Sequence, residues 1–201
     1  MLICIPDISG FTKFMSATEA ELSSKVILAL LNQIIYANEI GLRVSEIEGD
    51  AVLFFKRGEL PPLKKLIDQC TFFYSEFYKK LASLDDKHEM QNKPIIKSLG
   101  LKIILHYGEN VEAVNIGKHI KLMGEDVVIA HKLLKNTIDK DDYILFSQTL
   151  LDQYNTNDLD QRLFWSPLNQ GEENYKHIGD VNYAYVDLKP LNPLNKTNTN
   201  K

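Results

Sequence analysis

A short apolar run that ends on a carboxylate, close to the N-terminus, constrains this chain more than any other feature. Residues 3–8 are apolar except for Asp7, and they stop at Ser9-Gly10, where a helical pattern begins. A strand that breaks in this way leads into the N-terminus of a helix. The first N–H groups of a helix are unpaired and its dipole is positive there, so the junction can hold phosphate oxygens without a basic side chain.

A predicted β-hairpin is the second part of this pattern. Two apolar runs, 42–47 and 51–55, meet at Glu48-Gly49-Asp50, where glycine supplies the positive φ of a tight turn. A strand, a long helix and a hairpin begin a split βαβ unit, whose right-handed crossover places the third strand between the first two. Asp50 should then lie beside Asp7. Two carboxylates next to a phosphate-binding turn suit Mg²⁺ or Mn²⁺.

Four motifs in this chain resemble those of class III nucleotidyl cyclases, the adenylate/guanylate cyclase catalytic domains. They are Asp7-Ile8-Ser9-Gly10-Phe11-Thr12 against D-I-x-G-F-T, Gly49-Asp50-Ala51 against G-D-A, residues 104–109 against I-x-H-x-G-E, and residues 124–133 against G-x-x-V-N-x-A-x-R-L. Together they cover roughly residues 2–150 in the right order. Four ordered motifs are far harder to obtain by chance than one.

The resemblance implies a fold, a ligand and an assembly. The fold would be α+β, with a ferredoxin-like split βαβ core and a mainly antiparallel sheet flanked by helices. Two Mg²⁺ or Mn²⁺ ions would bind Asp7 and Asp50, and the backbone of Ile8, Ser9, Gly10, Phe11 and Thr12 would hold the phosphates of a nucleoside triphosphate. The family's reaction is an in-line attack of the ribose 3′-hydroxyl on the α-phosphate, with pyrophosphate leaving, in a homodimer.

The chain departs from the family where an Asn and an Arg orient the ribose and stabilise the transition state. Val128 stands at the Asn position and Lys132 at the Arg position. Valine forms no hydrogen bond through its side chain, and lysine lacks the planar fork that grips phosphate at two points. Loss of one such group typically costs about 10²–10³ in rate. Lys132 is therefore a catalytic candidate, with a solvated helix face as the other interpretation.

Selection of the base is left open by the sequence. Glu46 stands where the family carries Glu for guanine, whereas Lys121 matches neither the adenine nor the guanine pattern. Lys118, His119 and Lys121 are the nearby polar residues that could orient a ribose in place of the missing Asn. A single histidine in a strand, such as His106 or His119, is interpreted as a packed or surface residue, because the in-line mechanism needs no histidine.

Two functions follow from these residues. The first is an enzyme, a homodimeric nucleotidyl cyclase (a phosphorus-oxygen lyase) with weak or unusual activity. The second is a catalytically degenerate cyclase-homology domain that acts as a nucleotide-binding, dimerisation or regulatory module, and Val128 motivates it. Product formation separates the two, because both bind nucleotide.

Composition excludes several other classes. The 201 residues suit one domain, 1–188, followed by a Pro- and Asn-rich tail, 189–201. A formal charge of -4 offers no basic face for nucleic acid. The longest fully apolar run, Val26–Leu31, is too short for a membrane span, so a cytoplasmic protein is expected. Cys4 and Cys70 lack metal-site spacing and are expected to be buried free thiols.

The remaining elements are predicted from periodicity and turn residues. Capping boxes at 16–19 and 18–21 predict a helix that runs to about Asn38 and is closed by Gly41, and its broad apolar surface could face either its own sheet or a partner chain. Further predictions are a helix over 63–84 with core aromatics, a loop over 85–98, strands at 99–107 and 143–147, a strand with its return over 111–123, a helix over 126–135 and a late strand pair at 163–167 and 183–188.

Overall fold

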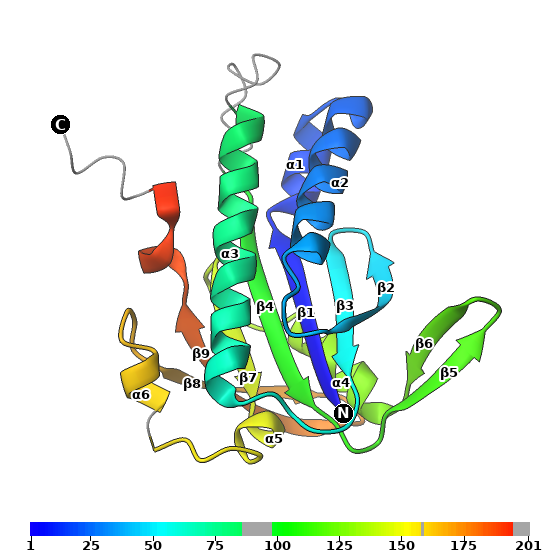
Figure 1. The fold of residues 1–201 in the computed structure, drawn as a ribbon, viewed down its shortest axis with the longest axis vertical. Helices are drawn as coiled ribbons and strands as arrows, with labels where there is room; N and C mark the ends of the chain where they lie inside the picture. The colour runs from blue at the N-terminus through cyan, green and yellow to red at the C-terminus, as the bar shows by residue number, and fades with distance from the viewer. Residues whose placement is uncertain (86–97, 158, 195–201) are drawn as a thin grey trace.

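The computed structural model describes residues 1–85, 98–157 and 159–194 (Figure 1). In chain order its elements are β1 (Leu2–Ser9), α1 (Phe11–Ala17), α2 (Ala20–Tyr36), β2 (Arg43–Glu48), β3 (Ala51–Lys56), α3 (Leu63–Asp85), β4 (Gly100–Tyr107), β5 (Glu112–Ile116), β6 (His119–Met123), α4 (Glu125–Leu133), β7 (Tyr143–Ser147), α5 (Gln148–Leu151), α6 (Leu159–Arg162), β8 (Asn169–Tyr175), β9 (Gly179–Asp187) and the 3₁₀ turn η2 (Lys189–Leu191).

A seven-stranded sheet in the order β2-β3-β1-β4-β7-β9-β8 forms the centre of the molecule. The β4–β7 pair is parallel, and the other neighbouring pairs are antiparallel. Strand β3 lies between β1 and β2, as the right-handed crossover of a split βαβ unit requires. The predicted α+β fold with a mainly antiparallel sheet is confirmed.

Alternation along the strands divides the interior into two layers. Leu2 and Cys4 of β1 belong to the cluster that packs under α2 and α3, whereas Ile3 and Ile5 belong to the cluster under α4. Figure 1 shows α1, α2 and α3 on one face of the sheet and α4 on the other. Because α4 has only nine residues, it covers part of its face.

The long helices are held mainly by packing within the chain. Most of the apolar surface of α2 is buried within the chain, without a partner. The buried residues are Val26, Ile27, Leu30, Leu31 and Ile34. Of the α3 aromatics predicted as core, Phe73, Tyr74, Phe77 and Tyr78 are buried and Phe72 is half-buried against the same cluster. Cys4 and Cys70 are buried and free, also as predicted.

The predicted start and end of the helix that runs to about Asn38, which corresponds to α2, are partly wrong. A separate helix, α1, precedes it, and the Ser16 hydroxyl donates to the Lys13 carbonyl inside α1 rather than capping α2. The N-cap of α2 is Glu19, without a side-chain cap. Gly41 lies in the loop after the helix, and Asn38 closes that loop by bonding both backbone groups of Leu42. A local bond replaces the predicted cap at Ser16, whereas the buried Thr18 hydroxyl has no hydrogen-bond partner among the described residues, so neither capping box forms.

The late strand pair is also partly wrong. The predicted strand at 163–167 is instead the turn that follows α6, and the Leu163 N–H donates to the Leu159 carbonyl. The partner of β9 is β8, a polar edge strand whose residues are half-buried or exposed. The sequence of β8 has no alternation of apolar and polar residues. The strand therefore forms because it pairs with β9, and not because of its own residue pattern. The predicted loop at 85–98 lies almost wholly outside the described residues.

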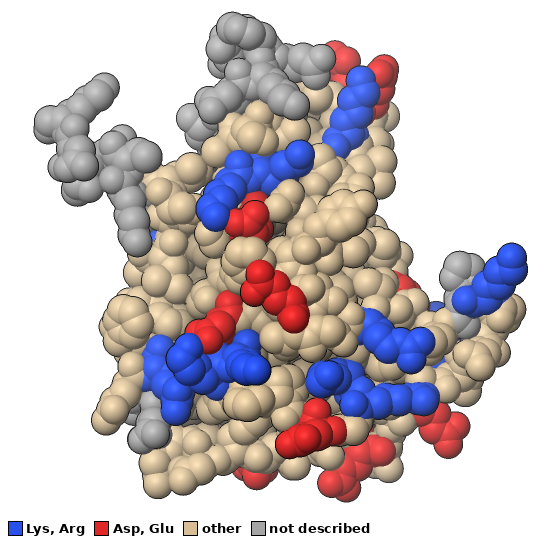
Figure 2. All heavy atoms as spheres, in the orientation of Figure 1, with Lys and Arg blue, Asp and Glu red and all other residues tan. Residues whose placement is uncertain are grey.

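The β5–β6 hairpin forms a second sheet that projects beside β2 in Figure 1. The Ser45 hydroxyl of β2 donates to the Ile120 carbonyl of β6 at 3.2 Å and attaches the hairpin to the sheet edge. On the face that carries α2 and α3, acidic and basic side chains are interspersed (Figure 2). Within the ranges described, no helix has the length and apolar character needed to cross a membrane.

Candidate functional site

The two acids of the first motifs lie side by side on the face that α4 partly covers. Asp7 follows Ile3 and Ile5 along β1, and in the antiparallel register it is opposite Ala51. The β2–β3 turn therefore places Asp50 next to it, and the Ile8 N–H donates to the Asp50 carbonyl at 3.0 Å. The Asp7 carboxylate is almost fully buried.

The environment of this pair disfavours two negative charges. Burial, and after it the nearby charge of Asp7, raise the pKa of Asp50 to about 6. A backbone hydrogen bond and the charge of Lys102 act in the opposite direction. A cation between the two carboxylates would relieve this repulsion.

Lys102 supplies such a cation from within the chain. It lies opposite Asp7 in the β1–β4 register, and its Nζ is 3.0 Å from Asp7 Oδ2. The same ammonium donates to the Leu134 carbonyl at 3.0 Å, at the negative end of the α4 dipole. The sequence analysis missed this residue. A lysine within the mainly apolar strand 99–107 was the signal, but its partner becomes visible only with the strand register.

A cavity of about 450 Å³ opens over these acids. It is bounded by β1, β3, β4, the end of β2 and one side of α4. It thus collects four positions that the motifs single out, Asp7, Asp50, Val128 and Lys132, within one chain. The other lining residues are Ile5, Glu48, Ala51, Leu53, Lys102, His131, Leu134 and Lys135.

Buried polar contacts set the position of α4. His106 Nδ1 is 2.9 Å from the Ser147 hydroxyl, and its Nε2 is 3.3 Å from Asp126 Oδ1 in the first turn of α4. The other oxygen of Asp126 accepts the Asn110 N–H at 2.8 Å. Burial lowers the pKa of His106, which favours the neutral ring. Of the two interpretations of His106, packed or surface, the structure supports the packed one, and the network orients the helix that carries Val128 and Lys132.

The turn after β1 has the expected shape but lies outside the lining of the cavity. Gly10 has a φ of 79°, and a Cβ there would lie 2.5 Å from the Ser98 carbonyl oxygen, so glycine is required. Its carbonyl accepts the Phe14 N–H at 3.0 Å, which begins α1. The Ser9 hydroxyl is already committed to the Asp141 carbonyl at 2.7 Å. Phosphate binding by residues 8–12 remains a prediction.

The two base-selecting candidates contact each other. Lys121 Nζ on β6 is 3.1 Å from Glu46 Oε2 on β2, and this hydrogen bond raises the pKa of the lysine. Lys118 lies in the exposed turn of the β5–β6 hairpin, and His119 begins β6. Among the described side chains, Glu46, Lys118 and Lys121 do not line the cavity over the acids.

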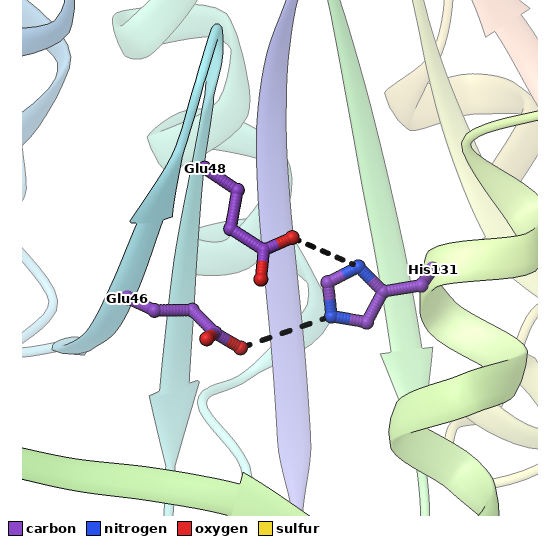
Figure 3. A group of neighbouring side chains, drawn as sticks. All are labelled: Glu46, Glu48 and His131. Carbon is purple, nitrogen blue, oxygen red and sulfur yellow. Dashed lines mark ion pairs between the residues drawn. The ribbon is translucent and has the colours of Figure 1, made fainter.

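A further group of donors lies at the side of the cavity, between β2 and α4 (Figure 3). His131 has its Nε2 3.9 Å from Glu46 Oε1 and its Nδ1 3.8 Å from Glu48 Oε2. The sequence analysis did not connect these residues, because they come from elements far apart in the chain. Glu46 and Glu48 at alternate positions of one strand were the available signal.

Nucleotidyl cyclases are among the solved structures to which this fold is similar. The adenylyl cyclase CyaB from P. aeruginosa has a TM-score of 0.60 and 18% identity, with 92% of each chain covered. The guanylyl cyclase Cya2 has a TM-score of 0.58 and 18% identity over 92% of this chain and 90% of its own. An adenylate cyclase from Trypanosoma brucei, in its monomeric state, has a TM-score of 0.61 and 13% identity, covering 92% and 86%.

The chain therefore has the fold of the class III adenylyl/guanylyl cyclase catalytic domains, as the motifs predict. It belongs to a family described as "Protein of unknown function (DUF2652)", whose profile matches residues 27–143. This range includes Asp50 and α4 but not Asp7. The chain is also similar to the "Uncharacterized protein Rv2561/Rv2562" of Mycobacterium tuberculosis, with 24% identity over 161 residues, 79% of this chain and 72% of that protein.

Proposed function

We propose that this chain binds a nucleoside triphosphate together with Mg²⁺ or Mn²⁺ in the cavity over Asp7 and Asp50. One observation carries the proposal: two adjacent carboxylates, one of them with a raised pKa, line a cavity in a cyclase fold. Clustered groups with perturbed pKa values in a cleft are typical of functional sites.

The donor set fits a divalent cation. Asp7 and Asp50 would hold it, since Mg²⁺ and Mn²⁺ prefer carboxylate oxygens and share their coordination with substrate phosphates. Bound there, the metal would neutralise charge on the triphosphate and its leaving group. Lys102 already occupies one oxygen of Asp7, so the ammonium and the metal compete for this carboxylate. The resemblance implies two ions. Because Lys102 pairs with Asp7, the acid pair offers these ions less negative charge than two free carboxylates would.

Binding without efficient cyclisation is the better-supported form of this function. Val128 lines the cavity at the position where the family has Asn, and an isopropyl group orients no ribose hydroxyl. Slow cyclisation is the second candidate, because Lys132 lines the same cavity and keeps a positive charge near the acids. In that role it would stabilise charge on the phosphates, whereas the acids would hold the metal.

A homodimer is part of the proposal. Ile116 at the turn end of the β5–β6 hairpin, Met123 at its other end and Val128 on α4 are large apolar side chains that are about half exposed. Large apolar side chains left exposed favour an interaction surface over a solvated one, and Val128 also lines the cavity. A second copy placed there would cover the cavity from outside.

A thermal-shift titration tests the binding function. The protein is mixed with ATP, GTP, CTP or UTP, each with MnCl₂ or with EDTA, and the same samples are analysed by mass spectrometry for cyclic product. A ligand at about 100 times its Kd stabilises by about 2.7 kcal/mol, which corresponds to several degrees in Tm for a chain of this size. The shift should require Mn²⁺.

Variants decide whether the shift comes from the proposed site. Asp50→Asn should abolish it, whereas Glu172→Gln on β8, an exposed carboxylate outside the cavity, should leave it unchanged. A cyclic product would identify an enzyme, and a shift without product would identify a binding module. No metal-dependent shift with any of the four triphosphates would refute both.

A further inference from the structure

We propose a transition-metal site formed by Glu46, Glu48 and His131, distinct from the acid pair and suited to Zn²⁺ or Co²⁺. It goes beyond the proposed function, because it needs neither a nucleotide nor Asp7 and Asp50. Its donors come from the edge strand β2 and from α4, so a bound ion would join these two elements.

The backbone places the three donors on facing surfaces. Glu46 and Glu48 are two residues apart on β2, so their side chains leave the same face of the sheet. On α4, Val127, Ala130 and Leu133 are buried against the sheet, which leaves His131 half-buried at the side of the helix. Figure 3 shows its ring facing both carboxylates, with one ring nitrogen directed at each.

The spacing fits a single ion after small movements. With one donor atom from each residue, the three ligand atoms all lie within 4.8 Å of one another. Zinc binds imidazole nitrogen and carboxylate oxygen at about 2.0–2.2 Å, so two of its ligands can be up to about 4 Å apart. The ring nitrogens are 3.9 and 3.8 Å from their nearest glutamate oxygens. Glu48 is exposed and can turn toward a shared ion.

The charges around the group favour a cation. Lys121 binds Oε2 of Glu46, and this leaves Oε1 directed at His131. Two carboxylates against one ammonium leave a negative balance beside a nitrogen donor. Imidazole suits zinc, cobalt and other transition metals, whereas Mg²⁺ prefers oxygen ligands alone. The histidine therefore separates the metal preference of this site from that of the acid pair.

The position of the site connects it with the cavity. Glu48 and His131 line the same cavity as Asp7 and Asp50, while Glu46 lies outside its lining. Three protein ligands leave a coordination position of zinc open for water or another ligand. An ion at this site would also brace β2, an edge strand, against α4.

Cobalt spectroscopy tests the site directly. Co²⁺ is titrated into the full chain in excess Mg²⁺, and visible absorption reports nitrogen and oxygen ligation, with competition by Zn²⁺. We expect saturable binding of one ion and a higher Tm with Zn²⁺. His131→Gln and Glu46→Gln should each weaken Co²⁺ binding by about 100-fold or more, since loss of even an outer-shell partner typically costs 10–100-fold.

Two matched controls keep the outcome specific. His177→Asn removes a histidine in the β8–β9 turn, where φ is positive and Asn is tolerated, and it should leave Co²⁺ binding unchanged. Asp50→Asn should also retain the Co²⁺ spectrum while losing the triphosphate shift. The Tm of each variant in EDTA reports whether it folds.

Three results would overturn the proposal. They are no saturable Co²⁺ binding by the wild-type chain, an unchanged spectrum in folded His131→Gln, or loss of the spectrum in Asp50→Asn. The last would assign the ion to the acid pair and leave the proposed function standing. Conversely, failure of the triphosphate to bind would not affect the Co²⁺ result.

Discussion

At the scale of single residues, the acid pair makes stability depend on pH through Asp50. The unfolded carboxyl titrates near 3.8, whereas the folded one has its pKa raised to about 6 by burial and by Asp7. The folded state therefore binds the proton more tightly. Stability from this group is fully present below about pH 4 and is lost as the pH rises through 6.

Asp50→Asn should consequently stabilise the metal-free protein at pH 7.5. The side chain is partly exposed, so we expect about 1 kcal/mol, or about 2–4 °C in Tm, rather than the full value of the shift. The gain over wild type should vanish near pH 4. Differential scanning fluorimetry in EDTA from pH 4 to 8 measures it, with Asp139→Asn, an exposed carboxylate, as the control. A gain that is independent of pH would contradict the mechanism.

Lys102 is the residue on which the charge of Asp7 depends when no metal is bound. Lys102→Met leaves a buried carboxylate without its partner, so we expect a loss of about 3 kcal/mol in EDTA. Mn²⁺ should restore part of this loss and should bind more tightly than to wild type, because its competitor is gone. Urea denaturation with and without MnCl₂ measures both effects.

The double variant Asp7→Asn/Lys102→Met provides the control for this prediction. It removes both charges and should be more stable in EDTA than Lys102→Met alone, because no buried charge is left unpaired. It should also lose the response to Mn²⁺. Equal stability of the single and double variants would show that the ion pair is not what Lys102 contributes.

At the scale of elements, the start of α4 depends on a close backbone approach at Gly124. Its φ is 132°, and a Cβ there would lie 1.9 Å from the Asn110 carbonyl oxygen. Gly124→Ala should therefore cost about 3 kcal/mol or more, from strain and from displacement of α4. Gly117 also has a positive φ, but it has open space around it. Gly117→Ala should therefore lower the free energy of unfolding by only about 1 kcal/mol. Chemical denaturation compares the two; equal losses would exclude the backbone clash.

Three glycines of the motifs are required by close contacts within the fold, whether or not the chain is catalytic. Gly10 meets the Ser98 carbonyl, Gly124 meets Asn110, and Gly108 meets the side chain of Asp126. A chain can keep these residues to preserve the fold even where the catalytic Asn is lost. The family pattern therefore predicts the fold more securely than it predicts turnover.

At the scale of the whole molecule, the proposed homodimer can be tested on its apolar surface. Met123→Lys together with Ile116→Lys should weaken self-association at least about tenfold, because two buried charges would lie in the interface. Leu28 on the outer side of α2 is similarly exposed, and Leu28→Lys should leave self-association unchanged. Sedimentation velocity measures the change. A wild-type chain that stays monomeric at high concentration would contradict the homodimer.

Much of the architecture could be predicted because it depends on neighbours in the chain. The alternation of β1, the Gly49-Asp50 turn and the period of α3 are local patterns, and the observed elements follow them closely. Strand β8 carries no such pattern, and the capping boxes near Ser16 competed with other local bonds. Strand β8 was missed because tertiary pairing with β9 creates it, and the capping-box prediction was wrong because the Ser16 hydroxyl bonds locally inside α1.

The residue order determined which chemical groups are available, and it also placed the acids together, because a split βαβ unit has only one common handedness. It did not reveal that Lys102 neutralises Asp7, that Glu46 pairs with Lys121, or that His131 faces two glutamates. These contacts depend on the register between strands and on where α4 rests on the sheet. Both are set by packing between segments far apart in the chain, which no local pattern records.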